Sequence, residues 1–170
     1  MASRFDIRIR SEAKKIRYPL SRLKKTAGKI LKILGWKKSG LSILLLNDAG
    51  IRKLNRKYLN HDRPTDVIAF GTISKSARFN SLIGIRRTNP ALLEMVPLLG
   101  DIAISLETAR RMAKELKTSL DYEIHLYLCH GILHLMGYDD HKPKDRAKMW
   151  AKQERILKKI WPYKKPKRSS

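Results

Sequence analysis

The sequence predicts an α/β (α+β) protein with a single mixed β-sheet and packed helices. Two observations predict this fold class. Short segments rich in apolar and β-branched residues alternate with amphipathic segments, and the last third of the chain is helical throughout. A chain of 170 residues can bury a core without disulfides. We expect one domain over residues 1–160 and a basic, disordered tail over 161–170.

Each element of the first half has its own local signal. The first segment alternates apolar and polar side chains, the period of a half-buried strand, and the second has helical spacing and closes at Gly35. Asn47 or Asp48 can cap the next helix. In order, we expect a strand over 4–10, a helix over 21–34, a strand over 41–47, a helix over 49–59 and a strand over 66–70.

The second half begins with residues 71–99, which have no sustained period. We expect a long loop there, with one short strand around 81–87. A strand over 100–105 follows it. The remaining elements are expected helices over 106–117, 120–136 and 143–160.

The charge of the chain is concentrated at its two ends. The chain has 38 Lys and Arg against 15 Asp and Glu, a formal net charge of +23. Residues 4–38 and 142–168 carry +21 of this charge, and the centre is nearly neutral. This distribution favours a polyanion, above all nucleic acid, bound at the periphery. The alternative is charge that only maintains solubility.

Cysteine usage and apolar runs bear on the compartment. Cys129 is the single cysteine, which excludes an internal disulfide framework and fits a reducing compartment. The N-terminus lacks the apolar core of a signal peptide. The longest apolar run, 43–46, is far shorter than the roughly 20 residues that span a bilayer. We therefore expect a cytoplasmic protein without a membrane partner.

The segment CHGILHLMGYDDH, residues 129–141, predicts a metal site on a helix and the turn after it. His130 and His134 share one helix face, with Cβ atoms about 5–6 Å apart, so both imidazoles can hold one zinc ion. Gly137 can take the positive φ that ends a helix. The spacing matches the frame H-x-x-x-H-x-x-G-x-x-ligand, with Asp140 as third ligand and His141 as the alternative. We expect one Zn²⁺ per chain.

The residues around this pair of histidines are expected to have different roles. Gly131 stands where zinc peptidases carry a catalytic glutamate, so we do not expect a peptidase. His125 is turned by roughly 140° from His130 on a helix and is expected to be structural. Cys129 is expected to be a buried, inert thiol. His61, in a basic loop, is expected at the surface or in contact with RNA.

Three sequence blocks resemble those of a known family. CHGILHLMGYDD resembles the H-G-x-L-H-L-x-G-Y-D-H signature of the YbeY family, LNRKYLNHDRPTDVIAF is similar to its L-N-x-x-Y-R-x-x-D-x-P-T-D-V-L-S-F block, and LLGDIAIS is similar to L-G-D-I-x-I. The resemblance covers about Leu41 to Leu157. It implies a single-strand-specific, metal-dependent endoribonuclease of late 16S ribosomal RNA processing and ribosome maturation. The implied partners are ribosomal RNA and the small ribosomal subunit, with zinc in a cleft and no small-molecule cofactor.

The chain departs from the family pattern at two positions. Leu59 stands where the resemblance implies a phosphate-binding arginine, and Asp140 stands in the place of a third histidine. Arg63, Lys57 and Arg56 are the nearest candidates to replace that arginine by contact with phosphate. Arg63 is our choice of catalytic residue, and ordinary solvated charge is the alternative. The expected RNA-binding residues are Arg56, Lys57, Arg63, Lys158 and Lys159.

Two other functions stay open on the sequence alone. One is a non-catalytic, zinc-containing ribosome-assembly or RNA-binding factor, which Leu59 and the absence of an obvious general base would fit. The other is a non-haem iron oxygenase, because two histidines and one carboxylate form the ligand set of such enzymes.

Overall fold

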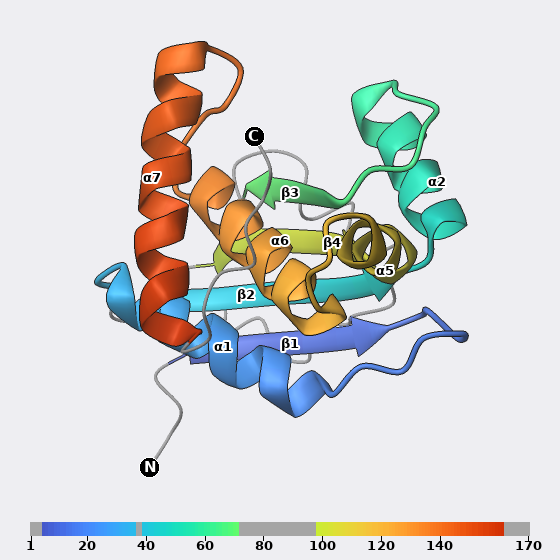
Figure 1. The fold of residues 1–170 in the computed structure, drawn as a ribbon, viewed down its shortest axis with the longest axis horizontal. Helices are drawn as coiled ribbons and strands as arrows, with labels where there is room; N and C mark the ends of the chain where they lie inside the picture. The colour runs from blue at the N-terminus through green and yellow to red at the C-terminus, as the bar shows by residue number, and fades with distance from the viewer. Residues whose placement is uncertain (1–4, 37–38, 72–97, 162–170) are drawn as a thin grey trace.

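The computed structural model describes residues 5–36, 39–71 and 98–161. These residues form one four-stranded mixed sheet with helices packed on it (Figure 1), so the predicted fold class is confirmed. The expected strand around 81–87 lies outside the described residues. The expected loop over 71–99 also lies outside them, except for Gly71, Leu98 and Leu99 at its two ends. The predicted tail lies outside them too, apart from Trp161.

The described elements follow the predicted order. The strands are β1 (Phe5–Ser11), β2 (Ser39–Leu46), β3 (Val67–Gly71) and β4 (Leu98–Ser105). The helices are α1 (Leu20–Ile33), α2 (Asp48–Leu59), α5 (Leu106–Glu115), α6 (Leu120–Leu135) and α7 (Pro143–Ile160). Each corresponds to an element predicted from the sequence, with ends that differ by two residues or fewer.

The sheet has the strand order β1-β2-β4-β3. β1, β2 and β4 are parallel, and β3 pairs antiparallel with β4 at the edge. Because parallel neighbours need a crossover, α1 connects β1 to β2 across one face. None of the helices in the described ranges is long and apolar enough to cross a membrane.

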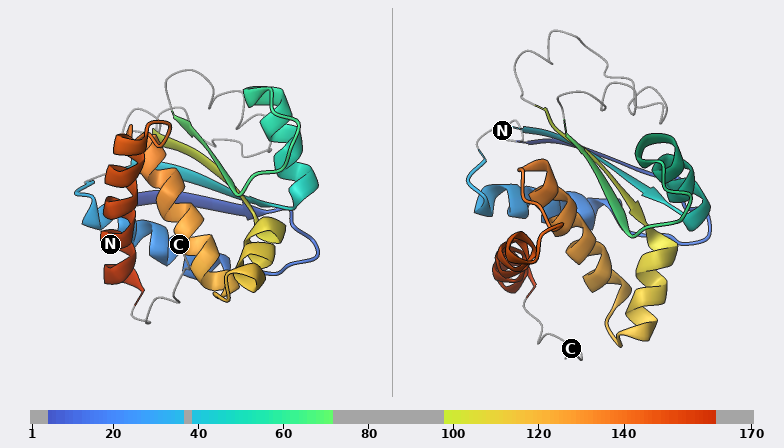
Figure 2. Two further views of the ribbon diagram at one scale, coloured as in Figure 1. Left: turned by 45° about the horizontal axis from the view of Figure 1, so that its top comes forward. Right: turned by 90° about the horizontal axis from the view of Figure 1, so that it is seen from above.

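Helices cover both faces of the sheet (Figure 2), so the inner strands are apolar on both sides. On β2, Ile43 and Leu45 face the larger core, formed with α1, α6 and α7. The alternate side chains Leu44 and Leu46 face a smaller core with Ile51 of α2. The continuous apolar run of β2 therefore reflects burial between two helical layers.

Helix α6 lies against β3 and β4 and is almost wholly buried. Its N-cap, Ser119, accepts a hydrogen bond from the Tyr122 amide at 3.0 Å. A Cβ on Gly131 would lie only 3.0 Å from Ile102 Cγ2 of β4. Gly131 therefore allows the close approach of α6 to the sheet, a packing role that the sequence did not reveal.

Candidate metal centre

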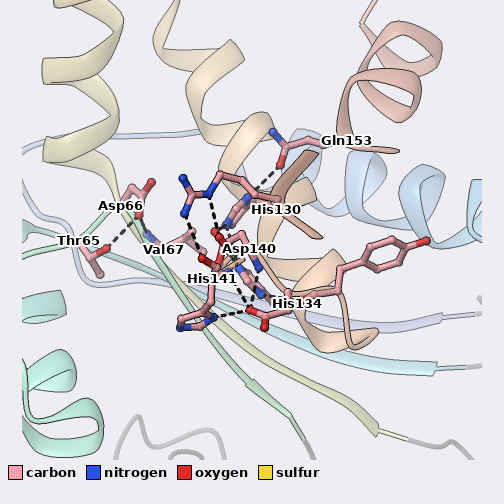
Figure 3. Close-up of polar contacts among 11 residues, drawn as sticks. Thr65, Asp66, Val67, His130, His134, Asp140, His141 and Gln153 are labelled. Atoms are coloured by element: carbon pink, nitrogen blue, oxygen red, sulfur yellow. Dashed lines mark hydrogen bonds and ion pairs between the residues drawn. The ribbon is translucent and has the colours of Figure 1, made fainter. Parts of the chain in front are cut away.

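The C-terminal end of α6 carries the two histidines and then reverses the chain. Gly137 has φ +88°, the left-handed conformation predicted for it. The Gly137 amide donates to the His134 carbonyl at 3.0 Å, and the Tyr138 amide donates to the Leu133 carbonyl at 3.1 Å. This turn returns the chain so that Asp140 comes back towards the helix (Figure 3).

Three side-chain donors converge at this point. His130 Nε2 and His134 Nε2 lie 2.9 Å apart. Asp140 Oδ2 lies 3.5 Å from the first nitrogen and 3.8 Å from the second. Zinc bonds of about 2.0–2.1 Å in tetrahedral geometry place ligand atoms about 3.3 Å apart. The three donors therefore lie close enough together to hold one shared metal ion.

The hydrogen bonds of the two imidazoles leave the converging nitrogens as electron-pair donors. A backbone carbonyl only accepts, so the 3.0 Å contact with Tyr138 O places a proton on His134 Nδ1. His130 Nδ1 donates in the same way to Gln153 Oε1 at 3.1 Å. Burial, with the neighbouring His134, lowers the pKa of His130, which favours its neutral form. Neutral imidazoles with Nε2 lone pairs are the form that binds a metal ion.

His141 is differently placed. Its side chain is 86% exposed, and its Nδ1 pairs with an Asp139 carboxylate oxygen. That hydrogen bond raises the pKa of His141, which favours the imidazolium form without a free lone pair on its ring nitrogens. Asp139, Asp140 and His141 also lie close enough together to form a second potential ligand group. The geometry supports Asp140 as the third ligand, and this assignment stays a prediction.

Two side chains of α7, Arg146 and Gln153, form hydrogen bonds with residues of the metal centre. Arg146 Nε donates to the Asp140 carbonyl at 2.9 Å, and Arg146 Nη2 donates to the His141 carbonyl at 3.3 Å. Gln153 is 2% exposed and fixes the His130 ring. Sequence reasoning missed Gln153, although one signal was present: it is the polar member of the buried α7 stripe formed by Met149, Gln153, Ile156 and Leu157.

The centre opens into a cleft of about 780 Å³. Its other wall includes Leu59, the end of α2, and Arg63 in the loop before β3. That loop is anchored at two points. Buried Asn55 donates through Nδ2 to the Arg63 carbonyl at 2.8 Å. Arg52 makes two 2.9 Å contacts with the Asp62 carboxylate.

The five predicted RNA-binding residues do not gather at one place. Arg63 lines the cleft, whereas Arg56 and Lys57 are exposed on α2 outside its lining. Lys158 and Lys159 are exposed in the last turn of α7, at the far end of that helix from the metal centre (Figure 1). His61 is exposed and lines the cleft. Asp66, not considered from the sequence, lines it as well.

The two remaining residues singled out near the histidine helix are structural. His125 is 2% exposed, bonds Thr26 Oγ1 at 3.1 Å and packs against the Trp161 ring, away from the cleft. Cys129 is fully buried, and burial raises the pKa of its thiol to about 12. The burial predicted for Cys129 is confirmed, and a thiol with a raised pKa is a poor nucleophile at neutral pH. His125 lies away from the cleft, as predicted.

Comparison with known proteins shows the relationship that the three blocks indicated. A family model described as Endoribonuclease YbeY matches residues 8–161. The chain belongs to the YbeY family. A protein named Endoribonuclease YbeY from Geobacter metallireducens is 40% identical over 145 residues, which cover 83% of this chain and 87% of that one. Another of the same name, from an Anaeromyxobacter species, is 35% identical over 152 residues, 89% of this chain and 70% of that one.

The solved structures include a similar fold. The solution structure of a protein from Thermotoga maritima matches 92% of this YbeY-family chain and 89% of its own with a TM-score of 0.59. The two sequences are 24% identical, so this likeness concerns the fold.

Proposed function

We propose that the chain is a metal-dependent endoribonuclease that cuts single-stranded RNA in late 16S ribosomal RNA processing and ribosome maturation. One observation carries the proposal: His130, His134 and Asp140 converge in a cleft that also contains Arg63. The relatives named Endoribonuclease YbeY support the reaction class. A hydrolase of this kind fits the cytoplasm, where ribosomal RNA is processed.

Zinc, one ion per chain, is the metal we propose for the site. His130, His134 and Asp140 would hold it, since two imidazole nitrogens and a carboxylate suit zinc better than Mg²⁺ or Ca²⁺, which take oxygen ligands. When bound, zinc supplies positive charge beside the scissile phosphate. Gln153 and the Tyr138 carbonyl keep both rings oriented with Nε2 towards the site.

Arg63 is the residue we propose for binding the phosphate opposite the metal. Its guanidinium can make two parallel hydrogen bonds to phosphate oxygens. The hydrogen bond from Asn55 to its carbonyl holds its backbone at the wall of the cleft. The neighbouring Leu59 has no donor, so the anchored loop is the source of positive charge on this wall.

The basic ends of the chain support ribosomal RNA and the small ribosomal subunit as partners. Helices α1 and α7 contact each other, and most of their Lys and Arg side chains are exposed. Lys158 and Lys159 belong to this surface. The logarithm of RNA affinity falls linearly with the logarithm of salt concentration. For a single strand, each phosphate that a basic side chain neutralises steepens this slope by roughly 0.7. Replacing both lysines with glutamine is therefore expected to reduce the slope.

The proposal is tested with purified full-length protein and a short single-stranded RNA. The wild type is assayed as purified, after treatment with a chelator, and after zinc is added back. His130→Ala is assayed beside it, and far-UV circular dichroism checks that the variant is folded. We expect internal cleavage that chelator abolishes, zinc restores, and His130→Ala lacks.

Two results would overturn the proposal. Cleavage by chelator-treated protein at an undiminished rate would exclude a metal-dependent reaction. RNA that the zinc-loaded wild type binds tightly but never cuts would favour the non-catalytic assembly factor.

A further inference from the structure

Among the described residues, two large apolar side chains are exposed, Leu59 and Trp150, each at 42%. Both line the cleft of the metal centre, Leu59 from α2 and Trp150 from α7. Exposed apolar side chains that lie together in one cleft, rather than scattered over the molecule, are typical of a ligand site.

The position of Trp150 on α7 places it beside the metal centre. Arg146, which bonds the Asp140 carbonyl, is four residues earlier, and Gln153, which bonds His130, is three residues later. At 100° and 1.5 Å per residue, these three side chains lie within an arc of about 60° on one helix face, with Trp150 about 4.5 Å along the axis from Gln153. The indole therefore stands in the row of residues that face the centre.

The charge of the cleft shows what Trp150 could contribute. Among the described lining residues, Arg63 is the one Lys or Arg, whereas Asp66, Glu123 and Asp140 are acidic. A polyanionic backbone gains little net attraction from such a lining without the metal ion. Within the cleft, additional affinity for a nucleic acid can come from its bases, whose π-faces stack on aromatic side chains.

We propose that Trp150 is a stacking subsite for one unpaired nucleobase next to the cleavage position. This inference rests on the proposed function, because it assumes that the cleft takes RNA. A base within a duplex has both faces covered by its neighbours, so Trp150 accepts only a base from a single strand or a flexible loop. The indole thereby contributes to selection of single-stranded substrate, and purines, with the larger stacking surface, bind there more tightly than pyrimidines.

The test measures binding without cleavage. The probes are 2′-O-methyl hexaadenylate and hexauridylate, whose modified 2′ oxygen cannot attack the adjacent phosphate. Gel electrophoresis checks that they stay intact with the zinc-loaded protein, and fluorescence anisotropy compares their affinities. Stacking on one aromatic residue changes affinity by roughly five- to hundred-fold on alanine substitution. We expect Trp150→Ala to lose about tenfold in affinity for hexaadenylate and most of the preference for adenine over uracil. Trp150→Phe keeps an aromatic face and should keep the preference.

A matched control separates stacking from charge. Arg155 is exposed on the same helix, turned by about 140° from Trp150. Arg155→Ala should change the salt dependence of binding and leave the adenine-to-uracil ratio unchanged. The zinc content of each variant is measured, so that loss of the centre is not mistaken for loss of stacking.

The outcomes distinguish this subsite from the proposed function. Trp150→Ala with wild-type affinity and base preference, in a protein that cleaves RNA, overturns the subsite alone. Trp150→Leu with the affinity and preference of the wild type also overturns it, because apolar contact would then suffice. A wild type that binds neither oligonucleotide overturns both.

Discussion

The Nε2 atoms of His130 and His134 face each other at 2.9 Å, and the Nδ1 atom of each ring donates to an oxygen elsewhere. At this separation a proton on one Nε2 forms a hydrogen bond to the other, and a metal ion bound by both nitrogens takes the place of that proton. Asp140 adds a carboxylate oxygen at 3.5 and 3.8 Å from the two nitrogens. The arrangement thus assembles an electron-rich site that a metal ion stabilises.

Gln153→Ala is expected to weaken zinc binding by about 10- to 100-fold, because the His130 ring loses the acceptor that orients it. Competition with a chromogenic chelator measures the affinity. Gln153→Glu supplies a carboxylate acceptor at the same place and should retain most of it. If Gln153→Ala binds zinc as tightly as the wild type, the hydrogen bond has no part in the centre.

Asp140→Ala should reduce zinc affinity far more than His141→Ala does. Asp140 Oδ2 lies near both Nε2 atoms, whereas His141 is exposed and paired with Asp139. The same chelator competition ranks the two variants. The opposite ranking would mean that the turn rearranges around the metal ion and brings His141 into the site.

Arg63→Ala should lower the cleavage rate tenfold or more, about 1.4 kcal/mol of barrier, and change RNA affinity little. Single-turnover kinetics and anisotropy measure the two quantities separately. Arg56→Ala and Lys57→Ala are matched controls, since both side chains are exposed on α2 outside the cleft. Equal losses in rate and affinity for all three would indicate diffuse electrostatics. Leu59→Arg, on the same wall, should raise activity only if catalysis uses that position.

His125 makes the free energy of unfolding depend on pH. Burial lowers its pKa to about 4 in the folded chain, despite the opposing effect of Asp121 at 3.8 Å, and Arg22 lowers it further. The unfolded histidine titrates near 6.5. Between pH 4 and 6.5, the unfolded state binds a proton at His125 that the folded state does not bind. The stability that comes from keeping His125 neutral is therefore present above about pH 6.5 and is lost as pH falls towards 4.

Urea denaturation at two pH values tests this linkage. From pH 7 to pH 5 the wild type should lose about 2 kcal/mol more than His125→Gln, which cannot titrate there. A pH dependence that is the same in both proteins would show that His125 remains neutral in the unfolded chain or is charged in the folded one.

The sequence predicted the parts of the centre that depend on local geometry. His130 and His134 are neighbours on any α-helix, and Gly137 fixes where the chain turns, so the spacing alone brought these residues together with Asp140. Gln153 could not be placed in the same way. Its contact with His130 spans 23 residues and depends on how α7 packs against α6.

For the fold, too, the sequence predicted local features but not long-range packing. Local patterns of apolar residues, together with capping and turn residues, predicted each described strand and helix. The strand order and the face on which each helix packs are long-range properties without a local signal. The close approach of Ile102 of β4 to Gly131 is one such long-range property. Arg63 and Trp150 likewise lie on one cleft only because α2 and α7 approach from opposite sides.

Titration of metal-free protein with zinc, with RNA cleavage as the readout, shows whether one metal ion at the His130 and His134 site is needed for cleavage. The cleavage rate of the wild type should rise in proportion to added zinc and level off at one ion per chain. A His130→Ala, His134→Ala double variant should neither retain zinc in elemental analysis nor cleave RNA. Unchanged zinc content and cleavage in the folded double variant would show that these two histidines neither bind the metal ion nor support cleavage.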